Sequence, residues 1–258
     1  NFDLGVSHRI SASTSLPNGN IDIFLINDST DIDGIYAGIS GTYTLGTSAD
    51  ADFLSLDTIE TVLNEGGMLG SVAIEIEDGI YEDQIKLGAI LGQDSTMEVT
   101  FRSISGDSTA VVLRHNSGSG NNYVMQFTNV KNVKIEGITL EAMNSSYGRV
   151  MTLVDTVENF SMTGCLLKSA NLNEYGIYSN DAELFNFEFI GNKVESLGYG
   201  VRVEGSSNGG NYIGGVRIED NEFYIRHWGI NVGEVNGIKV KNNYIESDGN
   251  GESTLLGV

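Results

Sequence analysis

The sequence contains little proline, one cysteine and no long apolar run, and each of these absences excludes a structural feature. One proline in 258 residues leaves almost every backbone N–H able to donate within a sheet, while 33 glycines allow corners with left-handed backbone angles. The single cysteine, Cys165, excludes an intrachain disulfide. No run of about 18 apolar residues occurs, so the sequence predicts no membrane span.

Basic residues are also scarce, with 14 Lys and Arg against 35 Asp and Glu and a net charge of −21. Nucleic acids and anionic membranes attract basic patches, so the charge argues against both as partners. It fits a secreted protein that stays soluble through self-repulsion, and divalent cations are ligands it would attract. An apolar fraction of 40% is enough to fill a core and argues against disorder.

An eight-residue pattern recurs five times in the second half of the chain. It reads apolar–x–apolar–x, then Gly, Asp or Asn, then a further residue, x and a final apolar residue. The copies are 133–140, 160–167, 187–194, 216–223 and 238–245, with starts 22 to 29 residues apart. Such a period predicts a solenoid, because one unit cannot bury its own apolar face and must stack on its neighbours.

A second set of strands lies between these copies. Segments 175–179, 199–203 and 228–232 begin with an aromatic residue and Gly, and 124–127 and 150–153 take the same place without that lead. Since alternation of apolar and polar residues indicates strands, each coil has three short strands. We expect about seven coils from residue 71 to the end.

The first 40 residues do not follow the repeat. Two strand-like segments, 6–12 and 21–26, flank a turn at 17–20, which predicts a hairpin or the remnant of a preceding domain. The acidic segment 27–34 is either a turn or linker, or a calcium loop around 31–34. The calcium loop lacks its glutamate, because the twelfth loop position is Ser40.

Residues 50–65 predict a helix that covers the first coil. Phe53, Leu56, Ile59 and Leu63 fall on one face, and Asp50 and Asp52 would lie at the N-terminal end. The domain organisation is then a hairpin segment at 1–40, a linker and capping helix at 41–70, and the solenoid at 71–258. The sequence has no initiator Met and no signal peptide, so we expect Asn1 to be a cut end. At the C-terminus we expect either that the parent chain continues or that a partner covers the end of the stack.

The corner pairs 191–192, 220–221 and 242–243 resemble those of the right-handed parallel β-helix, or pectin-lyase-like, superfamily. The resemblance implies an all-β, right-handed parallel β-helix. It also implies that Asn192, Asn221 and Asn243 form an internal hydrogen-bonded ladder. Ile138 and Cys165 occupy the same slot in earlier coils, where an apolar stack would replace the ladder.

Three segments of the leading part, 40–46, 77–85 and 101–107, are similar to the opening of β-helix modules in large bacterial surface or secreted proteins, of the kind exported by the type IX route. The resemblance implies a stalk or adhesin-type module that is secreted or held at the cell surface. Further domains of the same parent chain would then be its covalent neighbours.

In enzymes of this superfamily the cleft lies along the outside of the first strand. Alternation places four residues there: Met151, Tyr178, Arg202 and Asn231. Acids follow just beyond the strand as candidate calcium ligands: Asp155, Asp181, Glu204 and Glu234. A lyase would need calcium and a base, and Arg202 is the candidate base. No motif with a named catalytic role is matched, so a solvated acidic edge is the competing interpretation.

Tyr175, Tyr199 and Trp228 recur one coil apart. They form either an exposed strip for sugar rings or a buried or half-buried aromatic stack. The segment 226–228 gathers the most groups suited to contacting sugars. The candidate ligand-binding residues are Tyr178, Arg202, Arg226, His227, Trp228 and Asn231.

Two functions remain open. The first is a non-catalytic module that offers a binding face for a glycan or a protein and requires no cofactor. The second is a pectate-lyase-like lyase, or a hydrolase, acting on an acidic polysaccharide with calcium.

On the second strand the outward positions are Lys134, Ser161, Glu188, Arg217 and Lys239, which predicts a Glu188–Arg217 ion pair. Cys165 should be buried and unreactive.

Overall fold

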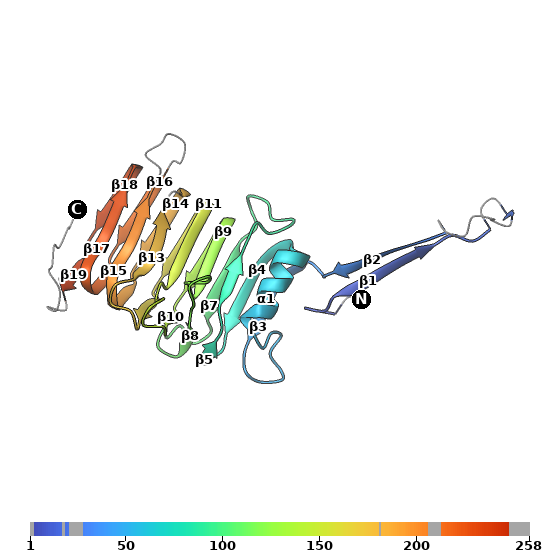
Figure 1. Cartoon of the computed structure of the whole chain (residues 1–258), viewed down its shortest axis with the longest axis horizontal. Helices are drawn as coiled ribbons and strands as arrows, with labels where there is room; N and C mark the ends of the chain where they lie inside the picture. The colour runs from blue at the N-terminus through green and yellow to red at the C-terminus, as the bar shows by residue number, and fades with distance from the viewer. Residues whose placement is uncertain (1–2, 17–18, 21–27, 181, 206–212, 248–258) are drawn as a thin grey trace.

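The computed structural model describes residues 3–16, 19–20, 28–180, 182–205 and 213–247. It is a parallel β-solenoid of about seven turns, with one short helix at one end and a two-stranded arm beyond it (Figure 1). The all-β solenoid expected from the repeat is therefore confirmed. No described helix is long and apolar enough to cross a membrane.

The solenoid strands form a single wound sheet of 17 strands. They are β3 (Ile39–Leu45), β4 (Met68–Ile76), β5 (Gly79–Glu82), β6 (Ile85–Leu87), β7 (Val99–Ser103), β8 (Val111–His115), β9 (Met125–Glu136), β10 (Thr139–Ala142), β11 (Met151–Thr163), β12 (Leu166–Ser169), β13 (Tyr175–Asn180), β14 (Glu183–Ile190), β15 (Lys193–Glu204), β16 (Ile213–Glu219), β17 (Glu222–Gly233), β18 (Val235–Lys241) and β19 (Tyr244–Ser247).

Each coil has three sides, here named the first, second and third sheet. The first sheet holds β6, β13 and the parts of β9, β11, β15 and β17 that pair with them. The second holds β3, β4, β7, β14, β16, β18 and the later parts of β9 and β11. The third holds β5, β8, β10, β12, β19 and the starts of β15 and β17. The final apolar residues of the repeat stack in one buried column on the third sheet. They are Leu113, Leu140, Leu167, Val194 and Phe223, followed by Ile245.

The solenoid begins earlier than residue 71. β3 pairs in parallel with β4 from Ile39 to Leu45, so this strand belongs to the stack instead of to a linker. The helical segment leaves the stack between these two strands and returns to it. Periodicity did not predict β3 as a solenoid strand, because it precedes the helix and does not match the recurring pattern.

The helix covers the N-terminal end of the stack, as Figure 1 shows. It consists of α1 (Leu56–Thr61) and a π-helical turn, η3 (Val62–Gly66). The apolar face expected from the sequence is confirmed for Leu56, Ile59 and Leu63, which are fully buried. Phe53 is also buried, but it lies before the helix and forms a β-bridge with Leu45. The helix therefore shields the first coil from water.

The start of the helix differs from the prediction. Ser55 is the N-cap, and its hydroxyl accepts a hydrogen bond from the Thr58 N–H at 3.3 Å. Asp52 lies before the helix and accepts from the Thr44 N–H at 2.8 Å, while Asp50 is in the preceding turn. A serine cap therefore sets the boundary, and both acids lie before the first turn of the helix.

The N-terminal arm pairs β1 (His8–Ser13) with β2 (Ser29–Ile35) in antiparallel register. The second strand is thus the segment assigned to an acidic loop, while the expected strand at 21–26 lies outside the described residues. Residues 31–34 therefore lie in a strand, and not in the turn, linker or calcium loop expected, and Asp31 and Asp33 lie near Arg9 at 2.5 and 3.6 Å. Their carboxylates serve as ion-pair partners on one face of a strand.

An asparagine ladder fills the corner between the second and third sheets. The side-chain oxygen of Asn192 accepts from the Cys165 N–H at 2.9 Å, that of Asn221 from the Asn192 N–H at 2.8 Å, and that of Asn243 from the Asn221 N–H at 3.0 Å. Each side-chain amide also donates to a backbone carbonyl inside the coil: Met162, Phe189 and Ile218. The ladder therefore satisfies backbone groups that the corner removes from the sheet.

Cys165 continues the ladder slot with a thiol. It is 2% exposed, and its sulfur lies 3.3 Å from the Thr163 carbonyl and 3.7 Å from the Ile135 carbonyl. Burial raises the pKa of its thiol to about 12. The thiolate is the reactive form, so almost none is present at neutral pH.

We expect Cys165 to resist alkylation in the native protein. Iodoacetamide at slightly alkaline pH should leave the native chain unmodified by mass spectrometry, while the urea-unfolded chain gains one adduct. The unfolded sample is the control for reagent activity. Rapid modification of the native chain would contradict the buried environment.

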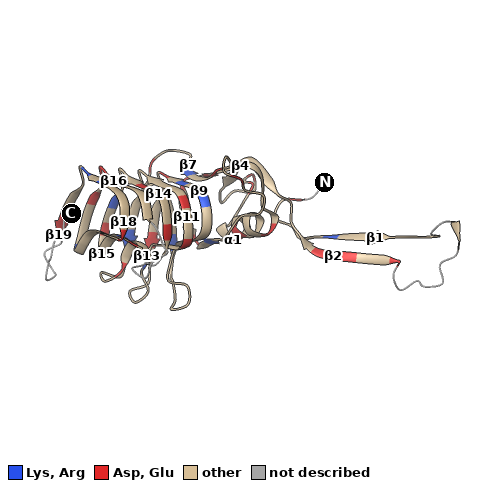
Figure 2. Cartoon of the chain, turned by 90° about the horizontal axis from the view of Figure 1, so that it is seen from above, with Lys and Arg blue, Asp and Glu red and all other residues tan. Residues whose placement is uncertain are grey.

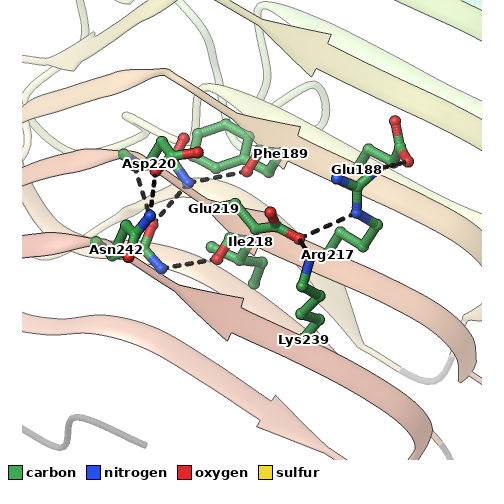
Figure 3. Close-up of polar contacts among 10 residues, drawn as sticks. Glu188, Phe189, Arg217, Ile218, Glu219, Asp220, Lys239 and Asn242 are labelled. Atoms are coloured by element: carbon green, nitrogen blue, oxygen red, sulfur yellow. Dashed lines mark hydrogen bonds and ion pairs between the residues drawn. The ribbon is translucent and has the colours of Figure 1, made fainter.

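Ion pairs cover the outside of the second sheet near the C-terminal end. Lys134, Ser161, Glu188, Arg217 and Lys239 form one column, as predicted. Arg217 lies 2.5 Å from Glu188, which confirms that pair, and Glu219 joins Arg217 to Lys239 at 3.1 and 2.8 Å (Figure 3). Hydrogen bonds from Lys239 and Arg217 lower the pKa of Glu219. Each such pair stabilises the surface only slightly.

Candidate functional site

The outer face of the first sheet carries a polar column that runs along the solenoid. The pairing places Gln126, Thr152, Tyr178, Arg202 and Asn231 side by side in successive coils. Three of these residues were expected to point outward together, and the structure brings them together.

Met151 does not belong to this column. It is fully buried and pairs with the buried Ile177, so its side chain points into the coil. Thr152 holds the outward position instead. This coil has no aromatic–Gly pair at the start of its first strand, so the sequence does not mark where the alternation begins. An error of one residue then assigns every side chain of the strand to the wrong face.

The aromatic residues form a second column beside the first. Tyr175 stacks on Tyr199 with ring centroids 4.5 Å apart and planes 18° apart, and Tyr199 meets the edge of Trp228 at 5.2 Å. All three side chains are half-buried, in agreement with the second of the two interpretations. The ring faces of the two tyrosines pack largely against neighbouring rings.

Arg149 extends this column by one coil. Its guanidinium lies 3.8 Å from the ring centroid of Tyr178, and its Nε lies 3.5 Å from Glu174. The Glu174 side chain is only 16% exposed and also accepts from the Asn122 amide at 2.8 Å. Arg149 and Glu174 thus fix one face of the Tyr178 ring.

Arg202 is held from two sides. Its Nε donates to Glu204 at 2.8 Å, its Nη2 also contacts Glu204, and its Nη1 donates to the Tyr175 hydroxyl at 3.4 Å. Burial lowers the pKa of Arg202, but the hydrogen bonds to Glu204 and Tyr175 outweigh burial and leave this pKa raised. A guanidinium held in this way keeps its proton, which opposes the role of a base.

The segment 226–228 contributes to the same face. The His227 ring lies 5.0 Å from the Tyr199 ring, and its Nε2 is 3.4 Å from the Asn173 side-chain oxygen. Arg226 is half-buried in β17. We name the surface made by Arg149, Glu174, Tyr175, Tyr178, Tyr199, Arg202, His227 and Trp228 the aromatic–arginine face.

The acids proposed as calcium ligands do not form a cluster among the described residues. No group of three His, Cys, Asp or Glu side chains with metal-binding geometry occurs in the part of the chain that the structure describes. Glu204 is engaged by Arg202, Asp155 accepts from the Asn129 amide at 3.3 Å, and Glu234 is exposed. Asp181 lies outside the described residues.

Sequence reasoning missed Arg149 and Glu174. Register gives the signal that could have found the arginine. Because Met151 pairs with Ile177, Arg149 takes the place in its coil that Tyr175 takes in the next. Glu174 directly precedes Tyr175 at the corner. Both residues lie just outside the apolar pattern that defined the strands.

No protein-family model and no curated protein matches this chain. Among solved structures, it is similar to a pectin methylesterase from Aspergillus niger in deglycosylated form, at 12% identity over 86% of this chain and 93% of the other, with a TM-score of 0.39. It is also similar to a pectin methylesterase from Erwinia chrysanthemi, at 9% identity over 71% of this chain and 66% of the other, with a TM-score of 0.39. These likenesses concern the fold alone.

Proposed function

We propose that this chain is a non-catalytic β-helical module of a large secreted or cell-surface bacterial protein, and that it binds its ligand through the aromatic–arginine face. The observation that carries the proposal is the packing of Tyr178 beneath Arg149, beside the stacked Tyr175 and Tyr199. Tyrosine, tryptophan and arginine dominate the energetic centres of binding surfaces. Side chains already fixed in place lose little entropy when a ligand binds.

A protein surface is the favoured ligand. Sugar rings stack on free aromatic faces, whereas the Tyr175 and Tyr199 rings cover each other and Arg149 covers Tyr178. The groups that we assign to the ligand are therefore the ring edges, the tyrosine hydroxyls and the guanidinium of Arg149. Burial is the main cause of a raised pKa for Tyr199, so its hydroxyl stays a donor at neutral pH.

The proposal that the chain is part of a larger secreted or surface protein is supported by the sequence. Segments 40–46, 77–85 and 101–107 resemble the opening of modules that the type IX route exports, which favours an adhesin-like stalk with further domains in the parent chain. The charge of −21 agrees with an extracellular protein that stays soluble at high concentration.

We expect the labelled chain to bind intact cells from a panel of bacterial and animal lines, and the Arg149→Ala/Tyr178→Ala variant to bind about 10-fold or more weakly, which corresponds to the loss of a hot spot. The matched control is Arg217→Ala/Tyr224→Ala, which removes an arginine and a tyrosine from the other two sheets. Equal binding by both variants would contradict the assigned face. Pretreatment of the cells identifies the ligand: loss after protease supports a protein, and loss after periodate supports a glycan.

The alternative function, an acidic-polysaccharide lyase, makes a different prediction. Such an enzyme would release unsaturated uronates that absorb ultraviolet light, with calcium and Arg202 both required. The Arg202–Glu204 ion pair speaks against a free base, so we expect no absorbance change with pectate or other polyuronates, with or without calcium. Turnover that disappears in Arg202→Ala would overturn the non-catalytic proposal.

A further inference from the structure

The N-terminal arm forms a sheet of its own. β1 and β2 pair only with each other among the described strands, and Figures 1 and 2 show them extending beyond the solenoid along its long axis. Every residue of the two strands is exposed except His8 and Ile35, which are half-buried. A two-stranded hairpin without a covered face is marginally stable in water.

The arm has one apolar and one charged face. Ile10 lies directly opposite Ile32, and the two side chains are 46% and 58% exposed. Arg9 and Asp31 form an ion pair on the other face. The apolar pair gains stability when more strands extend the sheet around it, so the arm is incomplete as an isolated ribbon.

The two free edges of the arm differ in charge. β2 carries Asp31 and Asp33, and charged residues on an edge strand oppose pairing with another strand. β1 carries no acid. The edge of β1 is therefore the one open to a further strand.

The backbone groups at that edge can be assigned. The Thr14 N–H donates to the Asp28 carbonyl directly opposite at 2.7 Å, so alternation turns Ala12 and Ile10 toward β2 in the same way. Ser11 and Ser13 then direct their N–H and carbonyl groups to the free edge. Removing these groups leaves the β1–β2 ladder intact.

We propose that β1 pairs with β1 of a second copy of this chain, antiparallel and centred on Ser11, to give a four-stranded sheet. In this register Ser11 faces Ser11, Ile10 faces Ala12 and Arg9 faces Ser13 of the second copy. Apolar residues stay on one face, and the two arginines avoid each other. The same surface serves both chains, as a closed two-fold interface requires.

Charge favours this arrangement over contact between the bodies. The chain carries −21, so two solenoids repel each other. The arm places the contact beyond the end of the solenoid, as Figure 2 shows, and keeps the acidic bodies apart. Dimerisation through the arm is independent of the proposed ligand face.

Sedimentation over a concentration series up to millimolar tests the proposal. We expect the mass of the native chain to approach twice that of the monomer, and Ser11→Pro to remain monomeric because it removes an outward N–H from β1. Ser29→Pro is the matched control, since by the same alternation its N–H points to the free edge of β2, and it should still dimerise. Circular dichroism should show an unchanged solenoid in both variants.

Three outcomes would overturn the proposal: a native chain that is monomeric at every concentration, a Ser11→Pro dimer, or loss of the dimer in Ser29→Pro alone. Hydrogen exchange gives a second measurement. Protection of the Ser11 and Ser13 amides should rise with protein concentration, while the Ile10 and Ala12 amides, which bond to β2, should change less. Concentration-independent exchange at Ser11 would count against the pairing.

Discussion

Replacing Asn221 by alanine should lower the free energy of unfolding by about 4 kcal/mol, because two buried backbone groups lose their partners at roughly 1–3 kcal/mol each. Asn221 is 1% exposed, its side-chain oxygen accepts from the Asn192 N–H, and its amide donates to the Phe189 carbonyl. It also bonds to Asn243, so both neighbouring coils lose a contact. Urea unfolding followed by circular dichroism measures the change.

Asn242→Gly is the matched control at the same corner. Asn242 is exposed, its side-chain amide donates to the exposed Asp220 at 2.9 Å, and its φ of 55° suits glycine. We expect a change of about 0.5 kcal/mol or less, as for most surface substitutions. If Asn221→Ala cost no more than this control, the ladder would not be a stabilising element.

Gly200→Ala should destabilise the fold by about 3 kcal/mol or more, since overpacking of a closely packed core costs 1–3 kcal/mol even where side chains can move. A Cβ at Gly200 would lie 2.2 Å from the Gly229 carbonyl oxygen and 2.5 Å from the Phe223 ring. The oxygen belongs to the backbone of the next coil and cannot move alone. Thermal melting should show a large decrease in Tm.

Gly214→Ala makes the same change in β16 without the clash. Its new Cβ would meet only the Asn236 carbonyl oxygen, at 3.6 Å, an ordinary contact. We expect stability to be unchanged or to rise by about 0.5 kcal/mol, because alanine restricts the unfolded chain. Equal losses at both positions would mean that the close approach of coils at Gly200 is relaxed in solution.

The aromatic–Gly pattern could be read from the sequence, but its cause could not. The repeat identified the strands that begin at Tyr175, Tyr199 and Trp228. The structure adds that a Cβ at Gly176 or Gly200 would strike the backbone of the next coil, while one at Gly229 would strike the Ile245 side chain. At Gly176 the atom struck is the Gly200 carbonyl oxygen, at 2.8 Å. Distances between coils depend on register, which periodicity alone does not give.

The solenoid was predictable because its signals are local and repeated. Alternation at Val133, Phe160 and Phe187 specified strands, and the pairing places these three residues in one buried column. Elements that occur once were harder to place. The hairpin partner was missed because β2 contains Asp31 and Asp33, which are typical of loops until Arg9 pairs with them.

The candidate site was predicted in part for the same reason. Tyr178, Arg202 and Asn231 repeat with the coil, so alternation assigned them correctly to one outer column. Arg149 lies at a corner, where no period applies, and its contact with Tyr178 depends on side chains from two successive coils. Sequence patterns specify which face a strand residue occupies, but they do not specify which corner residue covers it.

The corner slot holds asparagine in the later coils and apolar side chains in the earlier ones, and this difference affects how a solenoid can lengthen by duplication of a coil. Where Asn192, Asn221 and Asn243 hold the slot, every coil offers the next the same donors and acceptors. Duplication of one whole coil in that half of the gene would leave each buried amide paired. In the earlier coils Ile138 and Cys165 occupy the slot with buried side chains that carry no amide group. A copied coil there would have to match the side-chain volumes of its neighbours. The asparagine half is where length can vary between descendants of one ancestor.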